Sequence, residues 1–199
     1  MEFTLKRTVQ IVAILLLTAA VTQAVYTALY VAEADVPRQF LWGTEGLLFV
    51  LLAAFAGSAM VEAKRYSLGW SAITMAAVLN VVQVGVGLTM FGPFYEAAGE
   101  VEALAPAAGS VVAFSFMVYN AAKILLGLAA IVFGMAVMQS GGKVLGGLTA
   151  GIGALAMVAN TLSMAAGRDV TGELPLAGGS GVLATVLLAV CLLKVAKED

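Results

Sequence analysis

Lys123 and Glu45 are the two charged side chains whose sequence surroundings most directly suggest chemistry. Lys123 interrupts the apolar stretch YNAAKILLGLAAIVFGMAVMQ, which runs from Tyr119 to Gln139, and Glu45 lies within a second long apolar segment. A charge in apolar surroundings is costly unless an opposite charge or hydrogen-bonding groups compensate it. We therefore expect Glu45 to be the counter-ion of Lys123, with amide side chains from other segments completing a polar site.

The composition argues against several kinds of active site. The chain contains no His and one Cys, Cys191. Without His, imidazole haem ligation, His-based zinc sites and Ser-His-Asp catalysis are excluded, and one Cys forms neither an intrachain disulfide nor a CxxC pair. Ser115, two turns from Lys123, is a poor nucleophile for a Ser-Lys dyad. We expect no catalytic residue, no cofactor and no metal, and we expect Cys191 to be a small packing residue.

The elements that must position these charges are membrane helices. Of the 199 residues, 62% are hydrophobic and 11% are charged, and a soluble domain carries about twice that charged fraction. We predict an all-α polytopic membrane protein that forms one transmembrane domain over residues 1–199. A membrane-crossing helix needs about 20 mostly apolar residues. Six segments are predicted to cross the membrane, at about 8–31, 40–61, 68–91, 111–138, 144–166 and 176–193. The sixth opens on Gly178–Gly181, where glycine weakens the first helical turn and either irregular backbone or the beginning of the helix is compatible with the sequence.

The charged residues between these segments predict an orientation. Basic residues gather on one side of the expected membrane, and the connections on the other side are mostly acidic. The basic residues are Lys6, Arg7, Lys64, Arg65, Lys143, Lys194 and Lys197. The positive-inside rule then places both termini in the cytoplasm of a multi-pass protein of the cell inner (plasma) membrane. The net charge of -2 argues against a nucleic-acid partner.

Two further patterns concern the connections and the pairing of segments. A shift of 77 residues superimposes Glu45–Leu88 on Ala122–Ala165 with nine identities. Since both segments start outside, turn inside and return, we predict an internal repeat that relates spans 2–3 to spans 4–5. The longest outer connection, Gly92–Ser110, is expected to be an ordinary solvated loop or to hold a short helix that Pro106 ends, on the membrane surface or as a lid.

The main polar side chains of five spans share one depth. At a rise of 1.5 Å per residue they lie roughly 24–26 Å above the inner face, in the outer third of a core about 30 Å thick. Neighbours about one turn away, and one nearby tyrosine, extend this polar belt. The expected ligand-binding residues are Glu45, Lys123, Gln83, Asn160, Asn120, Gln23, Asn80 and Tyr26. Ionisable groups at this depth suggest a functional site. The alternatives are a belt that only joins helices and a Lys123 that extends along its stem to the outer surface.

This set of groups predicts the kind of ligand. One ammonium, one carboxylate and several amides offer both charges and both hydrogen-bonding roles, which suits a small polar, zwitterionic or amide-bearing solute. A metal ion would need more carboxylates. We expect an integral membrane protein that binds or translocates such a solute, as a homo-oligomer or beside a partner membrane subunit. The alternative is a non-catalytic structural or accessory subunit of a larger membrane complex.

The overall architecture is similar to that of a known transporter family. Six spans, cytoplasmic ends and an Ala-rich first span, with Ala20, Ala24 and Ala28 at a spacing of four, resemble the substrate-binding subunits of energy-coupling-factor vitamin transporters. The resemblance is confined to architecture and gives no residue a role. An internal repeat would speak against it, and we assign the chain to no family on this basis.

Overall fold

The protein is helical throughout the part of the chain that the structure describes. The structure, a computed structural model, describes residues 3–32, 34, 36–167 and 176–198, and these residues contain no β-strand. The helices are α1 (Leu5–Val31), α2 (Gln39–Glu62), α3 (Ser67–Thr89), α4 (Phe91–Glu100), the 3-10 turn η1 (Glu102–Leu104), α5 (Ala105–Gln139), α6 (Lys143–Ala166) and α7 (Leu176–Glu198). Six helical segments in the described residues are long and apolar enough to cross a membrane, which confirms the predicted all-α, multi-pass architecture.

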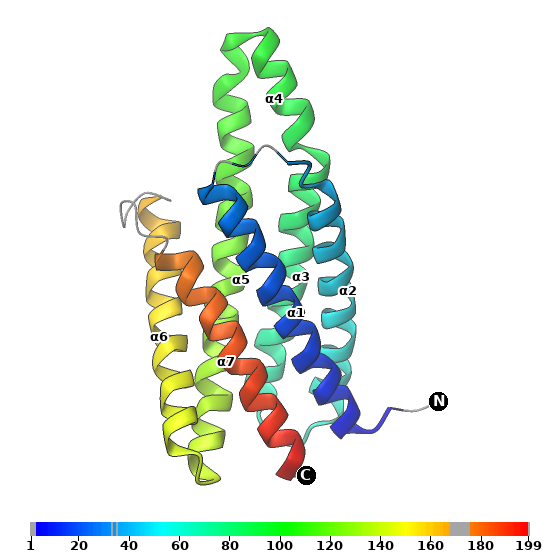
Figure 1. Ribbon diagram of the computed structural model, residues 1–199, viewed down its shortest axis with the longest axis vertical. Helices are drawn as coiled ribbons and strands as arrows, with labels where there is room; N and C mark the ends of the chain where they lie inside the picture. The colour runs from blue at the N-terminus through cyan, green and yellow to red at the C-terminus, as the bar shows by residue number, and fades with distance from the viewer. Residues whose placement is uncertain (1–2, 33, 35, 168–175, 199) are drawn as a thin grey trace.

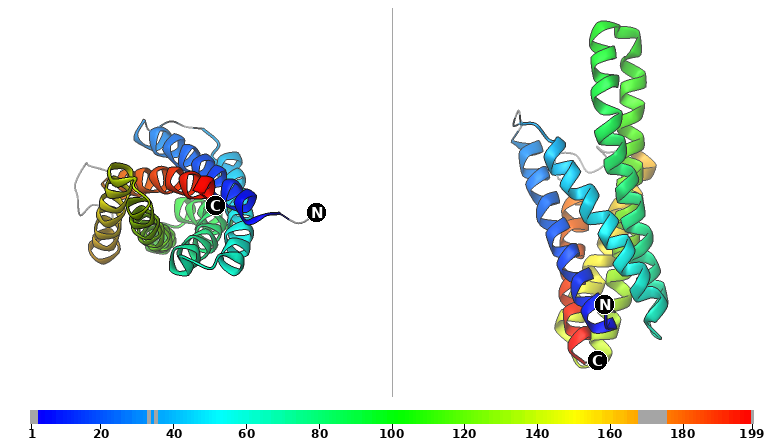
Figure 2. Two further views of the ribbon diagram at one scale, coloured as in Figure 1. Left: turned by 90° about the horizontal axis from the view of Figure 1, so that it is seen from below. Right: turned by 90° about the vertical axis from the view of Figure 1, so that its right-hand side faces the viewer.

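The long helices close into a ring (Figure 1, Figure 2). Following the chain, α1 packs on α2, α2 on α3, α3 on α5, α5 on α6 and α6 on α7, and α7 returns to α1. Helix α5 also packs against α7, so it has more neighbours than any other helix. By contrast, the backbones of α1 and α5 do not come together, and neither do those of α2 and α5. Long side chains must therefore fill the space between them.

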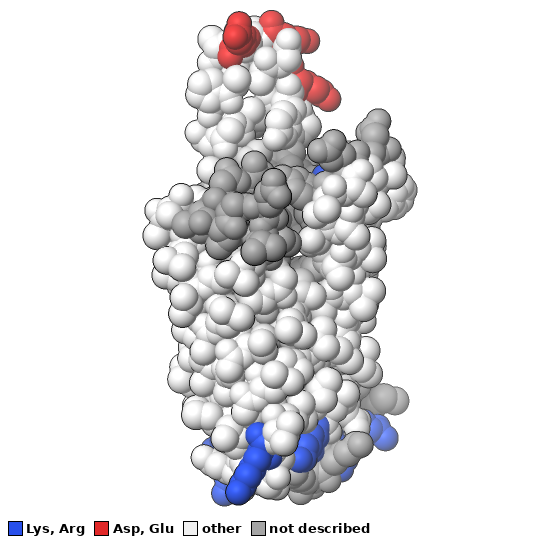
Figure 3. Space-filling view, turned by 60° about the vertical axis from the view of Figure 1, so that its left-hand side comes forward, with Lys and Arg blue, Asp and Glu red and all other residues white. Residues whose placement is uncertain are grey.

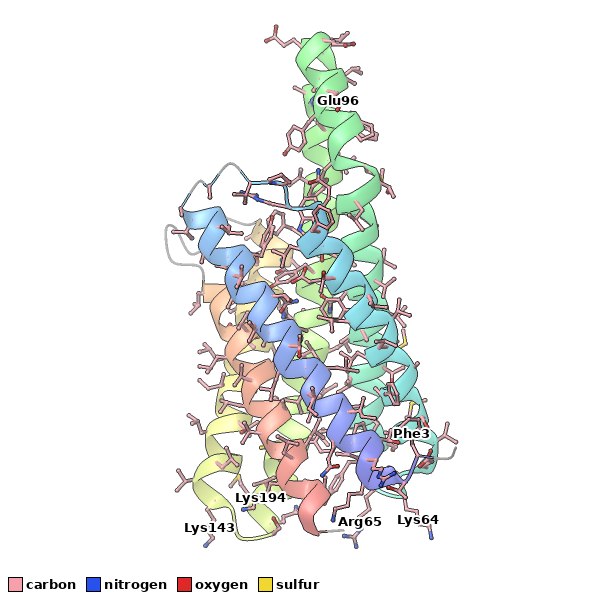
Figure 4. All side chains as sticks on the ribbon, turned by 45° about the vertical axis from the view of Figure 1, so that its right-hand side comes forward. Phe3, Lys64, Arg65, Glu96, Lys143 and Lys194 are labelled. Atoms are coloured by element: carbon pink, nitrogen blue, oxygen red, sulfur yellow. The ribbon has the colours of Figure 1, made fainter. Side chains whose placement is uncertain are left out.

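Opposite charges lie at opposite ends of the bundle. Lys64, Arg65, Lys143 and Lys194 lie at the end where α1 begins and α7 finishes (Figure 4). The acidic side chains visible in Figure 3 gather at the far tip, and a broad white surface of uncharged residues lies next to the basic end. This distribution matches a molecule whose middle lies in a membrane.

The predicted outer loop is instead a helical hairpin. Helix α4 follows α3 after a single residue, and α5 begins at Ala105, which is earlier than the predicted start near residue 111. Pro106 lies in the first turn of α5, where a missing N–H is tolerated, so the prediction that Pro106 ends a helix was wrong. The 35 residues of α5 span roughly 52 Å at the helical rise. The hairpin therefore extends along the bundle axis beyond the other helices (Figure 1, Figure 2).

Glycine permits the closest helix contact, between α5 and α6. A Cβ atom added to Gly127 would lie 2.7 Å from the carbonyl oxygen of Gly153, and one added to Gly134 would lie 2.7 Å from that of Gly146. Small residues at a shared face let membrane helices approach in this way. Glycine has a different place at the start of α7, where the segment Gly178–Gly181 is regular α-helix. Of the two alternatives for this segment, the structure shows the helix, which begins at Leu176 as the predicted sixth span did.

Candidate functional site

Lys123 is enclosed at the centre of the ring. Its relative exposure is 0%, and its Nζ donates a hydrogen bond of 2.5 Å to Oε1 of Gln23 on α1. The same Nζ lies 5.1 Å from the centroid of the Tyr119 ring, which is one turn earlier on α5. A cation over an aromatic face is attracted by the ring quadrupole. Lys123 therefore does not extend to the outer surface, and its compensation is internal.

Glu45 is the second buried charge, and it lies near Lys123 without bonding to it. Its relative exposure is 5%. The Thr22 hydroxyl lies beside the carboxylate, and Lys123 is close enough to interact electrostatically. Among the described residues no ion pair joins Glu45 to Lys123, and Oε1 of Glu45 is buried with no hydrogen-bond partner. The expected counter-ion thus acts at a distance, and the direct partner of the ammonium is an amide.

Helix α1 supplies a neutral group to each charge. Thr22 lies beside Glu45, and the next residue, Gln23, accepts from Lys123. Successive helical residues point in directions about 100° apart, so α1 reaches α2 with one side chain and the interior of the ring with the other. The Gln23–Lys123 hydrogen bond crosses between helices whose backbones do not meet. The side chains of Gln23 and Lys123 therefore bridge the interior of the ring between α1 and α5.

Helix α5 connects four of the eight expected belt residues through side-chain hydrogen bonds. Nε2 of Gln83 on α3 donates to the Ser115 hydroxyl at 3.3 Å. Nδ2 of Asn120 donates to the hydroxyl of Ser163 on α6 at 3.2 Å. With the bond from Lys123 to α1, these contacts join α5 to neighbours on three sides. The structure therefore brings Gln83, Asn120 and Lys123 onto one helix-centred network.

The two remaining asparagines are fully buried but bond mainly to backbone. Nδ2 of Asn160 donates to the carbonyl groups of Ala156, at 2.8 Å, and of Ala177 in the first turn of α7, at 3.1 Å. Nδ2 of Asn80 donates to the Ala76 carbonyl at 2.8 Å. The Oδ1 atoms of both asparagines have no partner among the described residues. Asn160 thus links α6 to α7, and neither amide group donates to another belt side chain.

Tyr26 joins the site to a group of aromatic side chains on α2 and α4. Its ring centroid lies 6.1 Å from that of Trp42, which in turn lies 5.6 Å from that of Phe91. The Arg38 guanidinium lies 5.5 Å from the Tyr26 ring centroid. Tyr119 interacts electrostatically with both Tyr26 and Glu45. Tyr26 therefore connects to the two charges through Tyr119 and also belongs to the aromatic group formed with Trp42 and Phe91.

Besides Tyr119, the site includes Thr22 and Gly181, which are not among the expected ligand-binding residues. Thr22 lies beside Glu45, but a helical threonine usually bonds to its own backbone, as Thr22 also does to Ala19, so its type alone gives no signal. A Cβ atom added to Gly181 of α7 would lie 2.9 Å from Cδ of Lys123. Gly181 thus leaves room for the lysine stem. Its contact depends on how α7 packs against α5, which no local pattern reveals.

Neither a metal-binding cluster nor a similar known protein indicates what this site binds. The described residues contain no group of three or more His, Cys, Asp and Glu side chains that could hold a metal ion. No protein-family model, no curated protein and no solved structure matches the chain.

Proposed function

We propose that this integral membrane protein binds or translocates a small, net-neutral polar solute at a site centred on Glu45, Lys123 and Gln23. One observation carries the proposal. Two opposite charges are buried close together, yet each faces a neutral group from α1 rather than the other charge. A direct ion pair would compensate both charges more fully, because attraction is strong in a medium of low dielectric constant. Unused bonding capacity of this kind suits a ligand that completes it.

The charge of the site favours a neutral ligand. Glu45 and Lys123 sum to zero, so a solute with a net charge would bring an uncompensated charge to membrane depth, at a cost of at least about 2.5–3.5 kcal/mol. Oε1 of Glu45 is an available acceptor. An ammonium has three N–H donors, and Gln23 occupies one. A neutral solute that carries both a donor and an acceptor fits these groups.

We further propose that the basic end of the bundle faces the cytoplasm, so that the site lies in the outer half of the inner (plasma) membrane. The positive-inside rule supports this orientation. Lys64, Arg65, Lys143 and Lys194 share the end at which α1 begins and α7 finishes. We also propose the internal repeat. It is compatible with the packing of α2 on α3 and of α5 on α6, which would be the two repeated helix pairs.

The rival function, a structural or accessory subunit, has a specific observation in its favour. Hydrogen bonds that join α5 with α1, α3 and α6 would hold the ring together without any ligand. Such bonds contribute about 1–2 kcal/mol in model membrane helices. The two functions differ in what the charges do when a solute is present.

The double variant Glu45→Gln with Lys123→Met separates them. Removing both charges together should preserve or raise the melting temperature, since replacing a buried ionic pair is often neutral or stabilising. Thermal unfolding of the detergent-purified chain would be measured with a panel of net-neutral and net-charged polar solutes. We expect a neutral solute at 100 times its Kd to add about 2.7 kcal/mol to the free energy of unfolding of the wild type and so to raise its melting temperature. The same solute should not change the melting temperature of the double variant.

Matched controls are available at the two ends of the molecule. Glu96→Gln and Lys143→Met make the same chemical changes at exposed positions far from the site (Figure 4), and both should respond to the solute as the wild type does. If no solute stabilises the wild type while the double variant stays folded, the structural function is the correct one.

A further inference from the structure

We infer that the solute is a compact zwitterion that presents an N–H-bearing ammonium to Oε1 of Glu45 and a carboxylate to the ammonium of Lys123. This inference rests on the proposed function and specifies its ligand. It commits to both charged ends of the solute and to their direction within the ring.

The Glu45 side of the site calls for a hydrogen-bond donor with positive charge. Oε1 is buried and unpartnered, and a buried polar atom left unpaired is unfavourable. A charged N–H donor forms a short, strong bond to a carboxylate. Trp42 lies three residues before Glu45, roughly on the same helix face, and packs on Tyr26. Aromatic rings beside a carboxylate add attraction for a cation.

The Lys123 side calls for an acceptor with negative charge. Its ammonium is bound by a neutral amide oxygen, and a carboxylate would be a stronger acceptor for the same donors. Thr22 and Gln23 lie side by side on α1 and contact Glu45 and Lys123 respectively. A solute that bridges the two charges would therefore lie along α1 and take over the contact with Gln23. Each charge would then face an opposite one.

Two other neutral ligand classes leave part of the site unsatisfied. A simple amide could hydrogen-bond to both residues, but it would bring no charge to either one. A quaternary ammonium zwitterion has the charges but no N–H to donate to Oε1 of Glu45. The N–H-bearing zwitterion is the class that satisfies both the hydrogen bonds and the charges.

The experiment compares three sets of probes on the purified full-length chain by titration calorimetry. The zwitterions are glycine, β-alanine and γ-aminobutyrate, which separate their charges by increasing distances. Their N-trimethyl analogues lack the N–H, and acetamide and propionamide lack the charges. We expect at least one zwitterion to bind, and its N-trimethyl analogue and the amides to bind at least about 10-fold more weakly, since bonds to charged groups contribute about 1.5–3 kcal/mol.

Single variants test the direction of binding. Glu45→Gln should weaken the zwitterion about 10- to 100-fold while affecting its N-trimethyl analogue less, because only the first donates to Oε1. Lys123→Met should weaken both of these carboxylate ligands equally. Glu96→Gln should leave all affinities unchanged.

The outcomes separate this inference from the proposed function. An amide could bind more tightly than every zwitterion and lose its binding in the double variant Glu45→Gln with Lys123→Met. This result would contradict the zwitterion inference but support the proposed site for a neutral solute. Equal binding of the N-trimethyl analogue would overturn the N–H contact. If none of the zwitterions binds, the inference is wrong, and the wider panel of solutes then decides the proposed function separately.

Discussion

Gln23 determines how the buried charges are arranged. It is the direct partner of the Lys123 ammonium, a role that the sequence suggested for Glu45. An amide can accept this hydrogen bond without neutralising the charge, so the lysine keeps its attraction for other anionic groups. A glutamate at position 23 would form an ion pair with Lys123 and neutralise the charge that could otherwise attract an anionic group. The residue type at position 23 therefore matters as much as the two charges themselves.

This role predicts a coupling between Gln23 and Lys123. Gln23→Leu should lower the free energy of unfolding by about 1.5–3 kcal/mol, because a buried ammonium loses its acceptor. The same change made together with Lys123→Met should cost much less, since no unpaired charge remains. Thermal or denaturant unfolding of the two single variants and the double variant would measure the coupling. Equal losses with and without Lys123 would show that Gln23 only packs.

At the scale of elements, α7 serves as a wall for the lysine. Gly181 faces the stem of Lys123, whereas Gly179 has no atom within 4 Å of an added Cβ. Both lie in the first two turns of α7, so replacing either by alanine gains similar helix propensity, about 1 kcal/mol. The difference between the two variants isolates the contact with Lys123.

We expect Gly179→Ala to leave the melting temperature unchanged or to raise it. Gly181→Ala should cost about 1–3 kcal/mol by overpacking, and it should weaken solute binding because the lysine stem must move. Thermal unfolding and calorimetry of the two variants would test this. A Gly181→Ala variant that matches Gly179→Ala in both measurements would remove α7 from the site.

For the whole molecule, the distribution of charge predicts how the bundle crosses the membrane. The acidic hairpin and the basic end lie at opposite extremes of the long axis (Figure 3). Cysteines placed at Glu100 and at Lys143 should therefore react with a membrane-impermeant thiol reagent from opposite sides of the membrane, with Lys143 on the cytoplasmic side. Native Cys191 is buried, so its background labelling should be low. Labelling of both positions from one side would contradict the topology.

Composition and the length of the apolar segments alone were enough to predict the six long helices. The length of an apolar run is a local property, and membrane thickness translates it into a helix. Predicted spans such as 40–61 and 144–166 accordingly lie within a residue or so of α2 and α6. The hairpin was missed because Pro106 is compatible with the end of one helix and with the first turn of the next.

The partner of each polar side chain depended on long-range packing. Depth is one coordinate, but a contact also needs the direction around each helix and the order of helices in the ring. Gln23 and Lys123 are 100 residues apart and lie on helices whose backbones never meet. Asn160 was expected to share a polar belt with Lys123, yet its amide bonds to the backbone of α7. Which neutral group separates the two charges is therefore a property of the assembled ring, because helix rotation and packing act over the whole chain.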